Sequence, residues 1–122
     1  MDKIVAVYDS ITGQTERFCN SLGIETVDIL DYEPDDRDVL LATRSQDFGK
    51  VPDSTLEFLE DYANKVVGTV VSGNRNWGAN YGMAGKVIEK DFNIPLILIF
   101  EGSGFKPDRE TVKNWIIDRY AD

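Results

Sequence analysis

Short and almost wholly apolar runs recur along this chain, and polar loops, often with glycine, follow them. The first run, 4–8, leads into a loop rich in hydroxyl groups, after which 15–22 repeats apolar residues at helical spacing. Strands that alternate with helices in this way form a parallel sheet with helices on its faces. The pattern therefore predicts an α/β fold.

The same pattern gives an expected order of elements. Strand candidates are 3–8, 25–30, 39–43, 66–72 and 94–100, and helix candidates are 15–22, a segment capped by Asp53 or Ser54, 79–90 and the segment from Pro107 to the end. We expect a doubly wound five-stranded sheet in the order 2-1-3-4-5, in which ligands lie beyond the carboxyl ends of the strands. Because only an acidic connector, 31–38, joins the second and third strands, we expect a reduced or missing helix there.

The composition predicts a single globular domain over residues 1–122. Of the 122 residues, 42% are hydrophobic and 29% are charged, which suffices for one core. No apolar run approaches the ~20 residues of a membrane helix, and the chain enters a strand soon after Met1, which argues against an export signal. Its only cysteine, Cys19, excludes an internal disulfide and reads as a core residue. We therefore expect a cytoplasmic protein.

The charge excludes some classes of function. A formal net charge of −9 argues against nucleic acid as a partner, because phosphate backbones attract basic surfaces. The chain has no histidine, which removes the side chain that most often serves as a catalytic base. The acidic connector is open to two interpretations, a solvated loop or a surface that docks a partner. A phosphate can still bind, since surface charges are screened beyond ~8 Å at physiological salt.

The loop after the first strand reads Ser-Ile-Thr-Gly-Gln-Thr over 10–15. Backbone N–H groups at a helix start lack partners within the helix and attract anions, and the hydroxyl groups add further donors. One interpretation is a phosphate cradle, and the other is an ordinary turn in which Thr12 or Thr15 caps the helix. The loop matches neither the nucleotide-triphosphate P-loop nor the dinucleotide fingerprint, so a single phosphate fits it better.

Two further loops, 44–51 and 73–78, fall at the carboxyl ends of predicted strands. Phe48 and Trp77 can stack on a flat ring, or they can pack at the rim of the sheet. Backbone groups near glycines can approach such a ring closely, at Gly49, Gly73 and Gly78. Together the three loops predict a site for a phosphate that carries a flat, partly polar ring.

Two of these loops carry a resemblance to known proteins. The segment 10–15 resembles the phosphate loop of flavodoxins, Ser/Thr-x-Thr-Gly-x-Thr. The segment 72–78, Ser-Gly-Asn-Arg-Asn-Trp-Gly, resembles the Ser-Gly-Asn-x-Asn-Phe/Trp-Gly segment of the NrdI family. Segments 48–52, 56–60 and 94–101 fit that family in order, so the resemblance covers nearly the whole chain.

The NrdI resemblance implies a fold, a cofactor and a partner. Members of this family are small flavodoxin-like companions of class Ib ribonucleotide reductase and bind one flavin mononucleotide (FMN). The reduced flavin reacts with oxygen to give superoxide or a peroxide-level oxidant, which assembles the dimanganese-tyrosyl radical cofactor in the radical (small) subunit. The implied partners are that subunit and a flavodoxin reductase-type electron donor, and the flavin itself carries the redox chemistry.

The resemblance also assigns residues to the cofactor. Segment 10–15 would hold the phosphate, and Trp77, with Asn76 and Gly78, would border one side of the ring. The complete set of expected contacts is Ser10, Ile11, Thr12, Gly13, Gln14, Thr15, Thr43, Arg44, Ser45, Phe48, Gly49, Ser72, Gly73, Asn74, Asn76, Trp77 and Gly78.

The middle loop departs from the family pattern. Relatives often read Thr-Tyr-Thr-Thr-Gly-Phe-Gly where this chain reads Thr-Arg-Ser-Gln-Asp-Phe-Gly over 43–49. Phe48 and Gly49 would lie along the pyrimidine and N5 edge of the ring, with Asp47 nearby in place of a glycine. Asp47 adopts positive φ less readily than glycine does. Arg44, in place of an aromatic residue, can favour the anionic reduced flavin or can pair with an acidic neighbour.

Two other functions fit the same pattern. An ordinary flavodoxin electron carrier would use the same fold, and its negative charge would help it to dock on a basic partner. A binding module that has lost the flavin could retain the fold, because fold alone does not fix function.

Overall fold

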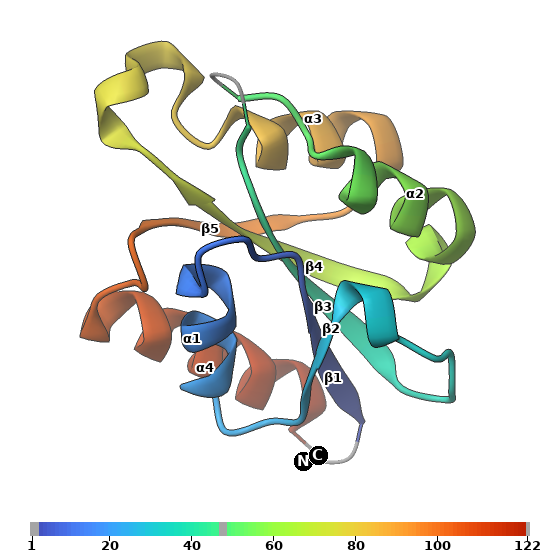
Figure 1. Cartoon of the computed structure of the whole chain (residues 1–122). Helices are drawn as coiled ribbons and strands as arrows, with labels where there is room; N and C mark the ends of the chain where they lie inside the picture. The colour runs from blue at the N-terminus through green and yellow to red at the C-terminus, as the bar shows by residue number, and fades with distance from the viewer. Residues whose placement is uncertain (1–2, 47–48, 122) are drawn as a thin grey trace.

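The computed structural model describes residues 3–46 and 49–121. Its centre is a five-stranded sheet in the order β2-β1-β3-β4-β5, with every neighbouring pair parallel (Figure 1). The strands are β1 (Ile4–Tyr8), β2 (Thr26–Asp28), β3 (Asp38–Arg44), β4 (Val66–Gly73) and β5 (Leu96–Glu101). The predicted α/β class and the predicted doubly wound strand order are both confirmed.

Helices cover both faces of the sheet. In Figure 1, α1 and α4 lie on one face, and α2 and α3 lie on the other. The α-helices are α1 (Gln14–Asn20), α2 (Asp53–Tyr62), α3 (Met83–Phe92) and α4 (Lys106–Tyr120), with 3-10 turns η1 (Ile29–Asp31), η2 (Ala63–Lys65) and η3 (Arg75–Asn80). Among the described residues, no helix is both long enough and apolar enough to cross a membrane.

The apolar runs fold as strands because both of their faces are buried. Val5 and Val7 of β1 pack in the group that contains side chains of α2 and α3, whereas Ile4 and Ala6 pack with α1 and α4. Cys19 lies in the second group with no exposed surface, and its burial raises the pKa of the thiol to about 12. The cysteine is therefore a core residue, as the sequence indicated.

The connector between β2 and β3 contains only the short turn η1, which confirms the expected reduced helix. The second strand is shorter than predicted and ends at Asp28. The Asp28 carboxylate accepts a hydrogen bond of 2.9 Å from the backbone N–H of Leu30, which caps η1. This local cap turns the chain out of the sheet, so residues 29–30 do not extend the strand.

One predicted helix start and one predicted helix cap were wrong. The helix expected over 79–90 begins at Met83, because Gly82 adopts a left-handed conformation (φ 65°) and ends the preceding segment. The residue before α2 is Pro52, and no side chain caps that helix, so neither Asp53 nor Ser54 has the predicted capping role. The Ser54 hydroxyl group donates instead to Asp9, at the end of β1.

Candidate functional site

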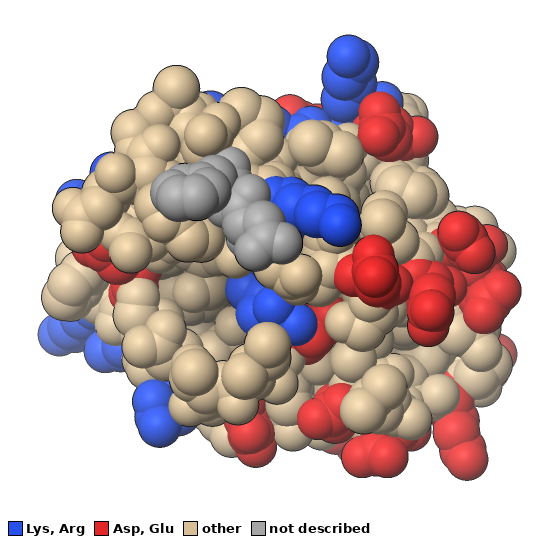
Figure 2. Space-filling model, turned by 45° about the horizontal axis from the view of Figure 1, so that its top comes forward, with Lys and Arg blue, Asp and Glu red and all other residues tan. Residues whose placement is uncertain are grey.

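A cleft of about 280 Å³ lies beyond the carboxyl ends of three adjacent strands, β1, β3 and β4. Figure 2 shows this face with a hollow, basic side chains near its centre and acidic side chains gathered to one side. The lining consists of Ser10, Ile11, Thr12, Gln14, Thr15, Arg44, Ser45, Ser72, Gly73, Asn74 and Trp77. The topology thus brings together most of the residues that the sequence singled out in three separate loops.

The loop after β1 forms one wall of the cleft. Gly13 adopts a left-handed conformation (φ 87°) at the start of α1, and its N–H group donates to the Ser10 hydroxyl oxygen at 3.0 Å. No side chain caps α1, so the alternative in which Thr12 or Thr15 serves as the cap is wrong. Both threonines line the cleft instead. The Ser10 hydroxyl oxygen is used within the loop, and its own proton remains a possible donor to a ligand.

The end of β3 and the described part of the loop after it contain four of the expected contact residues, and two of these line the cleft. Arg44 and Ser45 line the cleft, but Thr43 is fully buried below it. Gly49 has φ 118°, and a Cβ atom there would lie 2.5 Å from the Cβ atom of Met83. Gly49 therefore serves the close packing of this loop on α3. The other two residues predicted near the flavin N5, Asp47 and Phe48, lie outside the described residues.

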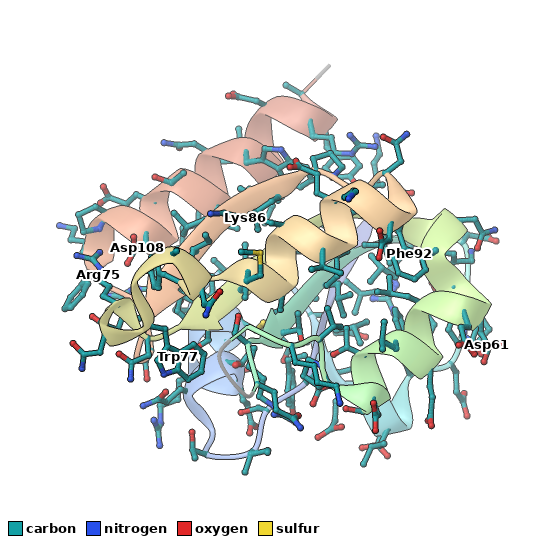
Figure 3. The ribbon with its side chains drawn as sticks, turned by 90° about the horizontal axis from the view of Figure 1, so that it is seen from above. Asp61, Arg75, Trp77, Lys86, Phe92 and Asp108 are labelled. Atoms are coloured by element: carbon teal, nitrogen blue, oxygen red, sulfur yellow. The ribbon has the colours of Figure 1, made fainter. Side chains whose placement is uncertain are left out.

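The loop after β4 supplies the opposite wall. Trp77 projects from η3 toward the loop that follows β1 (Figure 3), and it lines the cleft with Asn74. The Asn74 side-chain oxygen accepts a 2.9 Å hydrogen bond from the N–H of Asn76, which fixes the start of η3. Asn76 and Gly78 are not among the lining residues, although Gly78 has the positive φ (57°) that the turn requires.

Gly73 lines the cleft and also has a role in packing. A Cβ atom at this position would lie 3.1 Å from the backbone nitrogen of Gly82 and 3.1 Å from the ring of Tyr81. Few real Cβ atoms approach neighbours this closely, so Gly73 allows the segment before α3 to pack on the end of β4. This packing places η3 beside the cleft.

A buried polar network lies beneath the cleft, and sequence reasoning did not find it. Asp9, at the end of β1, accepts hydrogen bonds from the hydroxyl groups of Ser54 (2.5 Å) and Thr55 (2.7 Å) at the start of α2. The hydroxyl groups of Thr55 and Thr43 lie 2.7 Å apart. Because Thr55 gives its proton to Asp9, Thr43 must be the donor to Thr55. The sequence holds only a topological signal for this network, because Asp9 directly follows β1 and Ser54 lies at the start of the helix after β3, the next strand in the sheet.

Arg44 pairs with an acidic neighbour, which is one of the two alternatives that the sequence left open. The other, an effect on the reduced flavin, stays a prediction. The Nη2 atom of Arg44 lies 3.6 Å from the carboxylate of Asp9, and its Nη1 atom donates to the side-chain oxygen of Gln46 at 3.3 Å. The same side chain lines the cleft. Its Nε atom is buried and has no hydrogen-bond partner within the described structure. The positive charge of Arg44 in the lining makes the cleft suit an acceptor-rich or anionic ligand.

This fold and this cleft define a flavodoxin-type protein, with three loops at the switch point of a 2-1-3-4-5 sheet. The family described as "NrdI Flavodoxin like" matches residues 6–114, and the chain belongs to that family. It is 38% identical over 109 residues to the SPbeta prophage-derived protein NrdI of Bacillus subtilis (strain 168) and to the phage protein nrdI of Bacillus phage SPbeta. Each alignment covers 86% of this chain and 84% of the relative.

Solved structures show the same fold at low sequence identity. A short-chain flavodoxin associated with a bacterial microcompartment has a TM-score of 0.73 and 19% identity, with 94% of each chain covered. Oxidised flavodoxin 2 from Bacillus cereus has a TM-score of 0.69 and 19% identity, with 94% of this chain and 95% of that chain covered. Membership of a flavodoxin-like family supports a flavin as the cofactor.

The residues present in the cleft fit a flavin. Hydroxyl groups from three loops, the guanidinium group of Arg44 and the ring of Trp77 offer hydrogen-bond donors, positive charge and an aromatic face. Binding sites for small molecules usually combine an apolar surface with a few convergent polar groups. The lining has this character.

Proposed function

We propose that this protein binds FMN in the cleft and acts as an NrdI-type oxidant donor for class Ib ribonucleotide reductase. The observation that carries the proposal is the meeting of three loops at one sheet edge in a chain of the NrdI flavodoxin-like family. FMN is proposed over riboflavin because the loop over 10–15 offers several hydroxyl and amide donors to a terminal phosphate.

Each wall of the cleft has its own task in this proposal. Residues 10–15 bind the phosphate, and Trp77 with Asn74 borders the ring. Arg44, at the end of β3, and Ser45, directly after it, face the ring. The family pattern assigns Asp47, Phe48 and Gly49 to the same side. Thr43 acts indirectly, because its hydroxyl group supports Thr55 and Asp9 below the cleft.

The bound flavin supplies the redox chemistry, since its reduced form converts oxygen to superoxide or a peroxide-level oxidant. The protein holds the cofactor, orients it and sets the local charge. The oxidant then serves a manganese-loaded radical subunit, in which a tyrosyl radical forms. A flavodoxin reductase-type protein delivers the electrons.

Reconstitution tests this proposal. The FMN-loaded protein is reduced without oxygen, mixed with the cognate manganese-loaded radical subunit and exposed to oxygen, and tyrosyl radical is measured by electron paramagnetic resonance. We expect radical only in samples with the reduced flavoprotein. The matched control is the same protein left oxidised. A flavin-loaded protein that yields no radical with its cognate subunit would contradict the proposed role.

An ordinary electron carrier is the second candidate, and one feature of the surface favours it. Acidic side chains gather at the side of α2 and η1 in Figure 2, and Asp61 of α2 lies there in Figure 3. Such a surface suits docking to a basic electron-transfer partner. This candidate is favoured if the reduced protein passes electrons to an acceptor enzyme but neither binds the radical subunit nor yields radical.

A further inference from the structure

Arg44 is the only charged side chain among the described residues that line the cleft. Its guanidinium group spans two strands, because Nη2 lies 3.6 Å from Asp9 at the end of β1 and Nη1 donates to Gln46 after β3. These two strands flank the point at which the strand order reverses, where ligands of such sheets bind. The cation therefore lies at the centre of the proposed binding site.

Asp9 is held firmly behind this cation. Only 7% of its side chain is exposed, and it accepts hydrogen bonds from two hydroxyl groups at the start of α2. The positive end of a helix favours a carboxylate at that position. Arg44 thus faces the ligand on one side and a fixed negative charge on the other.

We propose that Arg44 and Asp9 form an opposed pair of charges that sets the reduction potential of the bound flavin. This inference rests on the proposed flavin site. At neutral pH the oxidised ring takes up two electrons and one proton, so the reduced ring carries one more negative charge than the oxidised ring. Arg44 favours that charge, whereas Asp9 opposes it and positions Arg44. Only 21% of the Arg44 side chain and 7% of the Asp9 side chain are exposed, so their charges are weakly screened.

A contact between Arg44 and the phosphate is the competing assignment. The loop over 10–15 already offers several hydroxyl and amide donors to a phosphate, whereas Arg44 points between β1 and the loop after β3. A phosphate contact would strengthen FMN binding but not riboflavin binding. A contact beside the ring would change the potential of both flavins.

The test is the two-electron midpoint potential of the full-length protein saturated with FMN, measured by anaerobic titration with dithionite against a reference dye. For Arg44→Gln we expect the equilibrium constant for reduction to fall about tenfold, which corresponds to a potential about 30 mV more negative. Arg44→Lys keeps the charge and should stay near the wild-type value. Asp9→Asn should shift the potential in the positive direction.

Arg75→Gln is the matched control, because it removes the same charge from an exposed side chain at the next strand end. The midpoint potential of the Arg75→Gln variant should stay at the wild-type value. A potential unchanged in Arg44→Gln, or lowered equally in Arg75→Gln, would overturn the inference, as would weaker binding of FMN alone with no change in potential. If Asp9→Asn does not fold, the difference in potential between Arg44→Gln and Arg44→Lys still shows whether the charge of Arg44 acts on the flavin. A wild-type protein that binds no flavin would instead overturn the proposed function itself, and the inference with it.

Discussion

Two arginines follow neighbouring strands at the same edge of the sheet, and their surroundings differ. Arg44 ends β3 and lies 3.6 Å from Asp9, while Arg75 follows β4 and lies 3.9 Å from Glu101. The exposed fractions are 21% and 7% for the side chains of the first pair, but 67% and 39% for those of the second. In Figure 3, Arg75 lies at the outer end of η3, away from the centre of the molecule.

The two pairs have similar distances but different burial, so we expect burial to decide how much each contributes to stability. Exposed pairs contribute about 0–1 kcal/mol to folding, because water screens them and long side chains lose freedom. Breaking a buried pair leaves one charge without a partner and destabilises a protein by about 3–5 kcal/mol. The Arg44 pair also borders a cleft, so its charge can act on a ligand as well as on the fold.

The largest effect should follow removal of the buried carboxylate. Asp9→Ala leaves Arg44 without its ion-pair partner and removes the acceptor for the hydroxyl groups of Ser54 and Thr55. We expect a loss of about 3 kcal/mol in the free energy of unfolding of the flavin-free protein, near the lower end of the range because Arg44 is partly exposed. Urea unfolding followed by circular dichroism measures this loss.

Glu101→Ala is the control for the exposed pair. Its expected loss is about 0–1 kcal/mol, since Glu101 and Arg75 both contact solvent. Equal losses of unfolding free energy in the two variants would mean that the network around Asp9 contributes no more than a surface contact.

The next largest effect should be on ligand binding in the cleft that Arg44 borders. Thr12→Val removes one hydroxyl donor from the wall of the cleft, and we expect FMN binding to weaken by about 1–3 kcal/mol. Titration of FMN fluorescence measures the dissociation constant. Thr111→Val removes a hydroxyl group on α4, outside the cleft, that donates to the carbonyl oxygen of Pro107, and should leave binding unchanged. An unaltered constant for Thr12→Val would contradict the phosphate assignment.

The fold could be predicted because its signals are local and repeated. The apolar runs identified the strands, and the short connector at 31–38 indicated the reduced helix between β2 and β3. The boundaries that went wrong depend on single backbone conformations. Gly82 ends one segment by its left-handed φ, and Asp28 ends β2 by capping η1. Each of these boundaries depends on the conformation of one residue, which the periodicity of apolar residues does not reveal.

The cleft could be predicted only in part. Residues in loops at strand ends were found, because the topology places the carboxyl ends of parallel strands at one edge. The hydrogen bonds from Ser54 and Thr55 to Asp9 were missed, since these residues lie 45 and 46 positions apart from it and no local pattern links them. Sequence reasoning also missed that Gly73 and Gly49, which were read as approaches to a ligand, serve close packing.

A smaller effect on flavin binding should distinguish two side chains of η3. Trp77 and Arg75 both belong to η3, but Trp77 lines the cleft and Arg75 does not. Trp77→Ala should weaken flavin binding by about 0.5–1.5 kcal/mol through the loss of an aromatic contact and should quench flavin fluorescence less. Arg75→Ala should change neither quantity. Identical fluorescence in Trp77→Ala and the wild type would show that Trp77 does not contact the ring.

The smallest effect should come from a third arginine. Arg37 contacts Asp35 at 2.8 Å and Glu25 at 3.1 Å, but these carboxylate side chains are 43% and 65% exposed. Hydrogen bonds from Arg37 lower the pKa of the Asp35 carboxyl group. A carboxyl group with a lowered pKa in the folded state adds stability above its unfolded pKa of about 3.9, and this stability is lost as the pH falls through the folded pKa. Arg37→Gln should therefore lower the urea midpoint slightly at neutral pH.

The dependence of this change in urea midpoint on pH and salt shows whether it comes from an exposed ion pair. The difference between wild type and Arg37→Gln should shrink as the pH falls below about 4 and as the salt concentration rises to about 1 M, because exposed charges are then screened within about 3 Å. The shift for Asp9→Ala should persist in the same salt, since Asp9 and its hydroxyl partners are buried. An Arg37→Gln shift as large and as insensitive to salt as that of Asp9→Ala would mean that exposure does not distinguish these pairs.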